Sequence, residues 1–84
     1  MSEKPTNKHF TEKQGQYLAY IHLYQQLHAT APSEADMQSY FKVTPPSVHR
    51  MVVALEKKGL ITKESNTPRS IKLLMTPSNI PKLL

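Results

Sequence analysis

The sequence predicts a mainly α-helical fold that ends in one small β-hairpin. Three observations support this: two capping motifs followed by helix-forming segments, a third helix start at Thr44-Pro45-Pro46, and two β-branched segments separated by turn-forming residues. A chain of 84 residues with 38% hydrophobic content can bury one small core. We therefore expect a single module.

The first helix is expected from about Glu12 to His28. Thr11 and Gln14 have the spacing of a capping box, in which each side chain bonds the backbone N–H of the other residue. Gly15 in the first turn costs about 1 kcal/mol of helix stability relative to alanine. The expected buried stripe is Tyr17 or Leu18, Ile21, Tyr24 or Leu23, and Leu27 or His28.

A shorter second helix is expected to begin after Ser33 and to end at about Phe41. Ser33 is an N-cap residue, and acidic side chains follow it in the first turn, where the helix dipole favours them. Only two residues separate this helix from the next helix start, a spacing typical of a helix–turn–helix. The side chains that we expect this helix to bury are Met37, Tyr40 and Phe41.

The third helix is expected to start at Thr44. Thr44 can accept a bond at the N-cap, and Pro45 and Pro46 fall in the first turn, where their missing N–H groups remove no helical bond. Gly59, after a lysine pair, should end the helix in the left-handed conformation. One face is apolar, with Val48, Met51, Val52 and Leu55. The opposite face shows Ser47, His49, Arg50 and Val53.

Residues 60–64 and 70–74 have strand character, and residues 65–69 between them are turn-forming. Two strands alone are only marginally stable, so the hairpin must pack on the helices. The order of elements is that of a three-helix winged helix–turn–helix, with the hairpin as the wing. We assign residues 1–9 to a flexible N-terminal arm, residues 10–75 to the domain, and residues 76–84 to a tail that is either frayed or a small docking segment.

The net charge of +5 is unevenly distributed. Residues 1–42 carry four lysines and four acids, whereas residues 43–84 carry seven cations and two acids, so the whole excess lies in the second half. Such an asymmetry suits a polyanion, because each neutralised phosphate releases condensed counterions. The alternative is a solvated basic face with no partner.

Composition excludes several other classes. With no cysteine there is neither a disulfide framework nor a thiolate metal site. No stretch reaches the roughly 18 apolar residues that span a bilayer, and the N-terminus lacks the apolar core of a signal peptide. We expect a cytoplasmic protein without a membrane partner, associated with the nucleoid when bound to DNA.

Three motifs resemble the N-terminal DNA-binding domain of LexA-type repressors. Residues 10–14, Phe-Thr-Glu-Lys-Gln, resemble the family's Leu-Thr-x-x-Gln, and Ala31-Pro32-Ser33 resembles its Pro-Pro-Thr/Ser. Residues 55–61 resemble Leu-x-x-Lys-Gly-x-Ile, and the similarity covers about residues 10–74. It implies a regulator that binds double-stranded DNA, with the third helix in the major groove and the wing on the backbone or minor groove. The family's base-reading positions fall on Thr44, Pro46, Ser47, His49 and Arg50.

Two departures limit what this resemblance implies. The family usually has small polar and acidic residues where this chain has a proline pair and His49-Arg50, so its operator sequence is not carried over. The self-cleaving domain, with its Ser-Lys dyad and scissile linker, has no counterpart in the 84 residues. We therefore expect no autoproteolysis from this chain.

Individual side chains leave alternatives open. Arg50 could fork onto guanine O6 and N7, or contact phosphate, or remain a solvated charge, and His49 could donate to a base or phosphate or be an idle surface imidazole. Arg69 at the wing tip is expected to contact phosphate. The strand lysines expected to do the same are Lys63 and Lys72. The four tyrosines could stack on bases, but their helical spacing favours packing in or beside the core.

No catalytic or metal site is expected. The four histidines are scattered, and His22 and His28 lie six residues apart on one helix, which does not suit one shared ion. We expect no cofactor and no small-molecule ligand. A homodimer is expected because one small half-site contact would bind weakly. The alternative function is a winged-helix adaptor for another protein; RNA binding is disfavoured because the strands lack exposed stacking aromatics.

Overall fold

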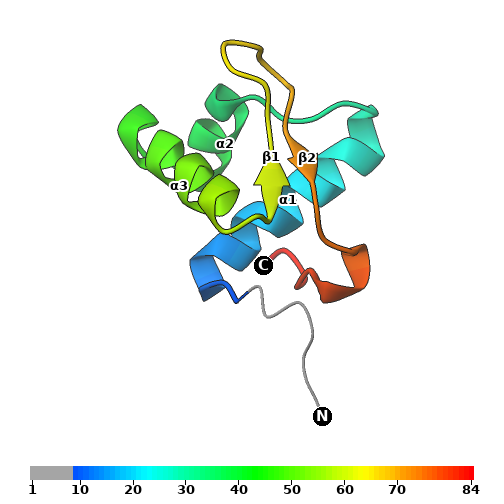
Figure 1. Cartoon of the computed structure of the whole chain (residues 1–84). Coiled ribbons are helices and arrows are strands. Elements are labelled where there is room, and N and C mark those ends of the chain that lie inside the picture. Colours follow the sequence, from blue (N-terminus) through cyan, green and yellow to red (C-terminus); the bar gives the residue numbers. More distant parts are fainter. Residues whose placement is uncertain (1–8) are drawn as a thin grey trace.

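The computed structural model describes residues 9–84. Within this range the elements are α1 (Glu12–His28), α2 (Glu34–Phe41), α3 (Pro45–Lys57), β1 (Ile61–Thr62), β2 (Lys72–Leu73) and the short 3-10 helix η1 (Pro77–Asn79). The predicted fold class is confirmed: three helices carry a two-stranded antiparallel hairpin (Figure 1). Of the predicted N-terminal arm, residues 1–8 lie outside the described residues.

The predicted limits of α1 are confirmed. Its capping box is formed, because Thr11 Oγ1 accepts from the Gln14 amide at 3.1 Å while Gln14 Oε1 accepts from the Thr11 amide at 2.9 Å. α1 ends at Ala29, which lies in the left-handed region with φ 58°. The cap therefore stops the helix without a glycine and sends the chain back towards α2.

α2 and α3 form the helix–turn–helix. Ser33 and Asp36 make a second capping box, with both bonds at 3.0 Å. Lys42 then turns the chain through a left-handed conformation, φ 58°, two residues before the Thr44 N-cap of α3. Gly59, with φ 75°, follows the end of α3 as expected. The turn is short, and it fixes α3 against α2.

The core lies where the three helices and the hairpin meet. All three helices and the hairpin contribute to it: Tyr17, Leu18 and Ile21 from α1, Met37 from α2, Val48, Val52 and Leu55 from α3, and Leu60, Ile61 and Ile71 beside or within the hairpin. Two sequence predictions of burial are wrong. Tyr40 is 44% exposed, and both alternatives at the end of the stripe are exposed, Leu27 at 69% and His28 beside it. α1 extends past the region that the hairpin and α2 cover, and Tyr40 lies outside the core, stacked on Tyr20.

The strands are shorter than predicted. Only Ile61 pairs with Leu73 and Thr62 with Lys72. Beyond these pairs the Ser70 hydroxyl replaces the strand ladder, because it accepts from the Glu64 amide at 3.0 Å and donates to the Thr67 carbonyl at 2.8 Å. A serine side chain that competes for backbone groups in this way favours a turn over a strand.

The tail, predicted to be either frayed or docked, packs back onto α1. The Gln16 side chain donates to the Lys82 carbonyl at 2.9 Å and accepts from the Leu84 amide at 2.8 Å. In Figure 1 this red segment runs beside the first half of α1. A Cβ on Gly15 would lie 2.9 Å from Pro81 Cγ and 3.0 Å from Phe10 Cε1. Gly15 thus allows a close approach, which offsets its poor helix propensity.

Candidate nucleic-acid interface

The exposed face of α3 carries the predicted base-reading positions. Thr44, Pro46, His49 and Arg50 are exposed and Ser47 is half-buried. The two hydroxyls at the helix start are engaged with each other, since Thr44 Oγ1 donates to Ser47 Oγ at 3.0 Å and also caps the Ser47 amide at 3.4 Å. Among these five residues only His49 and Arg50 have side-chain N–H donors.

Arg50 lies at a groove between α1 and α3. This open groove holds about 340 Å³ and is lined by Lys13, Gln14, Tyr17, Val43, Ser47, Arg50, Met51 and Ala54. Lys13, at the start of α1, therefore shares a surface with Arg50 of α3. Sequence reasoning missed Lys13, because 37 residues separate the two along the chain and only the packing of α1 on α3 brings them together.

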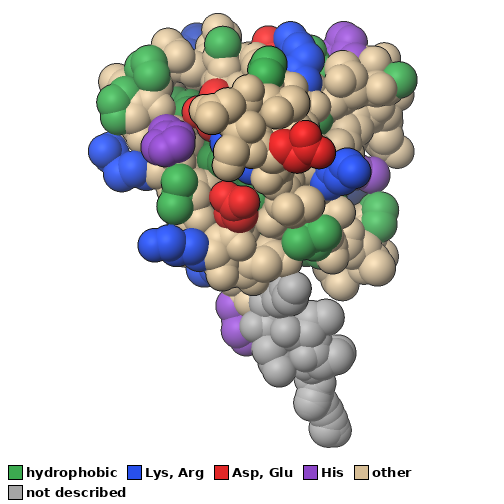
Figure 2. All heavy atoms as spheres, turned by 45° about the horizontal axis from the view of Figure 1, so that its top comes forward, with side chains coloured by type: hydrophobic (Ala, Val, Ile, Leu, Met, Phe, Trp, Pro, Cys, Tyr) green, Lys and Arg blue, Asp and Glu red, His purple; other side chains and the backbone are tan. Residues whose placement is uncertain are grey.

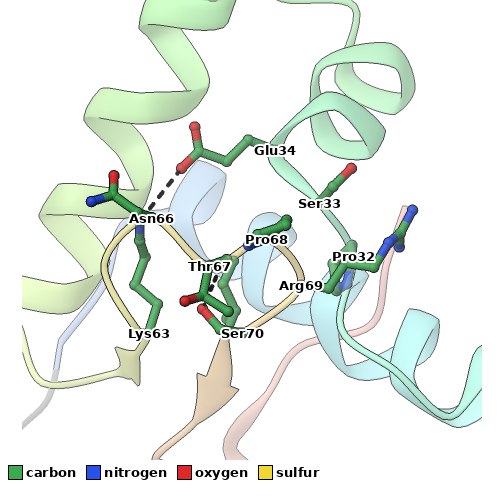
Figure 3. Close-up of a pocket in the computed structure, with 10 residues that line it drawn as sticks. Pro32, Ser33, Glu34, Lys63, Asn66, Thr67, Pro68, Arg69 and Ser70 are labelled. Atoms are coloured by element: carbon green, nitrogen blue, oxygen red, sulfur yellow. Dashed lines mark hydrogen bonds and ion pairs between the residues drawn. The ribbon is translucent and has the colours of Figure 1, made fainter.

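The hairpin presents its two lysines differently. Lys72 on β2 is exposed, whereas Lys63, just after β1, is half-buried. Lys63 Nζ lies 4.0 Å from Glu34 Oε2, and His49 Nδ1 lies 3.7 Å from Glu34 Oε1. Glu34 at the start of α2 thus lies between α3 and the wing, and Figure 3 shows Lys63 reaching towards it. No sequence signal marked this carboxylate.

Arg69 belongs to the wing loop, but its guanidinium is directed back to the helices. It lies 3.0 Å from Asp36 Oδ2, and it donates to the Tyr24 hydroxyl at 2.9 Å and to the Ala31 carbonyl at 3.2 Å. We expected a wing-tip cation that contacts phosphate. The structure instead gives this side chain three protein acceptors, because its left-handed backbone, φ 58°, turns it towards α1 and α2.

The electrostatics of this cluster are consistent with its contacts. Hydrogen bonding to the Tyr24 hydroxyl, with the nearby Asp36 carboxylate, raises the pKa of Arg69. The backbone amide of Ser33, followed by the Ser33 and Tyr24 hydroxyls and the Arg69 charge, lowers the pKa of Asp36 against the opposing effect of desolvation. Both groups are therefore charged at neutral pH.

Acidic side chains interrupt the basic ones on this end of the molecule. Figure 2 shows Lys and Arg side chains standing apart, with Asp and Glu side chains between them. The surface is not one continuous basic patch. Any polyanion contact must therefore use cations that stand at separate places on the surface.

The tyrosines pack among protein groups. Tyr17 is buried and stacks on Phe41 with centroids 4.1 Å apart, and Tyr20 stacks on Tyr40 at 4.6 Å. Burial raises the pKa of both Tyr17 and Tyr20. The preference for packing over base stacking is confirmed for these two residues.

Residues 9–84 contain neither a candidate metal site nor a candidate membrane span. No three His, Asp or Glu side chains in this part of the chain are grouped so that they could hold a metal ion. No helix there is both long enough and apolar enough to span a bilayer.

A helix–turn–helix whose second helix exposes polar groups beside a two-stranded wing defines the class: a winged helix–turn–helix DNA-binding domain. The chain belongs to the LexA DNA binding domain family, whose family model matches residues 7–70. The resemblance inferred from the sequence motifs is confirmed.

Relatives named LexA repressor cover most of this chain. That of Thermosipho melanesiensis is 42% identical over 73 residues, which is 87% of this chain and 37% of the relative. That of Thermosipho africanus is 40% identical over the same shares of each chain. That of Thermotoga neapolitana is 31% identical over 72 residues, 86% of this chain and 36% of the relative. The chain thus spans little more than a third of the length of these relatives.

Proposed function

We propose that this chain binds double-stranded DNA sequence-specifically as part of a transcriptional repressor, with α3 in the major groove and the hairpin on the flanking backbone. The observation that carries the proposal is the exposed His49-Arg50 pair on the outer face of α3, in a chain of the LexA DNA binding domain family. An exposed helix face of this kind is the surface with which helix–turn–helix proteins read base edges.

Within this proposal, different residues at the start of α3 make different contacts with one DNA half-site. Arg50 forks onto guanine O6 and N7, the commonest specific contact in the major groove. His49 donates to a neighbouring base or phosphate. At the helix start, the remaining predicted positions pack against the edge of the DNA major groove: Thr44, Pro46 and Ser47.

Phosphate contacts come from three lysines on two sides of α3. Lys63 and Lys72 belong to the hairpin, and Lys13 lies across the groove from α3 on the first turn of α1. Contacts on both sides of the inserted helix fix its register on the duplex, while carrying no sequence information themselves. The net charge of +5 supplies the counterion-release term of the affinity.

We further propose that residues 10–75 are the DNA-binding unit and that two copies act on one operator in the cytoplasm, at the nucleoid. One domain of this size covers a single half-site, so a pair on an inverted repeat gains both affinity and specificity. The proposed role is binding, not catalysis.

Selection of bound duplexes from a random pool by the purified protein tests this function. The expected result is an enriched motif, repeated in inverted orientation if two copies bind together. If the pool shows no enrichment after repeated rounds although the protein remains folded, the proposed sequence-specific DNA binding is rejected. Docking of another protein would then be the function to pursue.

A further inference from the structure

The hairpin loop is joined to the start of α2 by two ion pairs. Arg69 pairs with Asp36 at 3.0 Å, and Lys63 lies 4.0 Å from Glu34. Both acids belong to the first turn of α2. In Figure 1 the loop between β1 and β2 lies beside α2 at the top of the molecule, and Figure 3 shows Lys63 of the wing facing Glu34 of α2. Two cations of the wing thus meet two acids of the helix–turn–helix.

Apolar packing does little to hold this loop. Residues 64–69 are all exposed, and only two residue pairs form the strand ladder beneath them. An open cavity of about 210 Å³ separates the loop from α2, lined by residues 32–34, 63 and 66–71. A two-stranded hairpin is marginal without packing. The loop is therefore held mainly by polar bonds, and those of Arg69 have the shortest distances to the helices.

We propose that Arg69 is a positioning residue for DNA recognition. Its bonds to Asp36, Tyr24 and the Ala31 carbonyl fix the wing against α1 and α2, and so set where Lys63 and Lys72 stand relative to α3. The inference rests on the proposed function, because the wing's position matters only if it contacts the DNA that α3 reads. It replaces the phosphate contact expected for Arg69.

The substitution Asp36→Asn tests this proposal through the direction in which it changes the affinity for DNA. It removes a negative charge, so simple electrostatics predicts tighter binding to any DNA. Loss of the Arg69 anchor predicts weaker binding to the selected site. Asparagine keeps a side-chain oxygen for the Ser33 amide, so the cap of α2 is retained while the negative charge that holds the Arg69 guanidinium is lost. Glu56→Gln, at an exposed position near the end of α3, is the control for charge alone.

The experiment measures binding of wild type, Asp36→Asn, Arg69→Ala, Arg69→Lys and the double variant to the selected duplex and to a scrambled one, across a salt series. Asp36→Asn and Arg69→Ala are each expected to weaken the selected complex by roughly threefold to tenfold, and the double variant by no more than the worse single. Arg69→Lys should recover part of the loss. Any fall in the salt slope should be the same in Asp36→Asn and Arg69→Ala, because both displace the wing lysines, and Glu56→Gln should not weaken binding.

Amide hydrogen exchange checks the same claim without DNA. The Glu64 and Thr67 amides, both bonded within the loop, should exchange faster in Asp36→Asn and Arg69→Ala, while amides of α3 keep their wild-type rates. If amides throughout the Arg69→Ala variant lose their protection from exchange, the result for the milder variant Asp36→Asn decides the test. Loop amides that keep wild-type rates in a folded Asp36→Asn would overturn the proposal.

The possible failures are distinguishable. Wild-type protein that binds neither duplex contradicts the proposed function itself. Wild-type binding combined with equal or tighter binding by Asp36→Asn refutes only the positioning role. If Arg69→Ala weakens both duplexes equally and lowers the salt slope by about one while Asp36→Asn does neither, Arg69 contacts phosphate directly and the proposal is wrong.

Discussion

The ring of Pro81 lies against the α-carbon of Gly15, so closely that a Cβ at Gly15 would be 2.9 Å from Pro81 Cγ. This contact joins the C-terminal tail to the first turn of α1. The two bonds between Gln16 and the tail backbone lie next to it. The tail therefore forms part of the folded domain's surface, although it contains no strand and only one short turn of 3-10 helix.

Gly15→Ala should fail to give the gain of about 1 kcal/mol that helix propensity alone predicts. The added methyl group must displace Pro81 or Phe10, which lies 3.0 Å from the same point. We expect an unchanged or lowered free energy of unfolding, measured by urea denaturation. In a Pro81→Ala background the same substitution should be more favourable. A full gain in the wild-type background would show that the tail does not pack there.

Asp36→Asn should lower stability at neutral pH and lose that effect in acid. The amide of Ser33, with hydroxyl and Arg69 contacts, holds the pKa of Asp36 below its ordinary value. A carboxyl with a depressed folded-state pKa stabilises the protein above its unfolded-state pKa of about 3.9, and the contribution disappears as pH falls through the folded value. Urea denaturation at pH 7, 4 and 3 should show the gap between wild type and variant closing below about pH 4. A gap that stays constant down to pH 3 contradicts this assignment.

Arg50→Ala and Lys72→Ala should differ in kind. Removal of a base contact by Arg50→Ala is expected to cost about 1–3 kcal/mol on the selected site and to relax the preference at one base pair. Lys72→Ala, which removes a phosphate contact, should weaken all sequences about equally and lower the salt slope by roughly one. Titration of each variant against selected and scrambled duplexes measures the contrast. If Arg50→Ala weakens both duplexes to the same extent, specificity comes from Ser47, His49 or DNA shape instead.

The helices were predictable because their signals are local. A capping box needs only residues three apart, so Thr11 and Ser33 marked the starts of α1 and α2 without any knowledge of the fold. The proline pair after Thr44 did the same for α3. Periodicity also found the buried faces of α1 and α3 near their centres, where neighbouring elements cover them.

Burial at helix ends was not predictable from the same pattern. Tyr40 has helical spacing with Met37, yet whether a side chain is covered depends on elements far along the chain. The hairpin was predicted too long because Ser70, whose hydroxyl takes the place of ladder partners, was assigned to the second strand. Both errors arise from particular side-chain contacts that period and propensity do not record.

The candidate interface was predictable only in part. The exposure of His49 and Arg50 was predictable from the helical period, which places them opposite the apolar face of α3. Lys13 and Glu34 were missed because they join the surface only through packing of α1 and α2 on α3 and the wing. The direction of the Arg69 side chain depends on a left-handed backbone at a residue other than glycine. The sequence does not predict that conformation.

Sequence-specific binding to double-stranded DNA is tested by fluorescence anisotropy with a labelled selected duplex and a scrambled duplex of equal length, over a salt series. We expect tighter binding to the selected duplex at every salt concentration, with an affinity that falls steeply as salt rises, by a log–log slope of about −0.9 for each phosphate neutralised. Folded protein that binds neither duplex at low salt, or that binds both equally under all conditions, would contradict it.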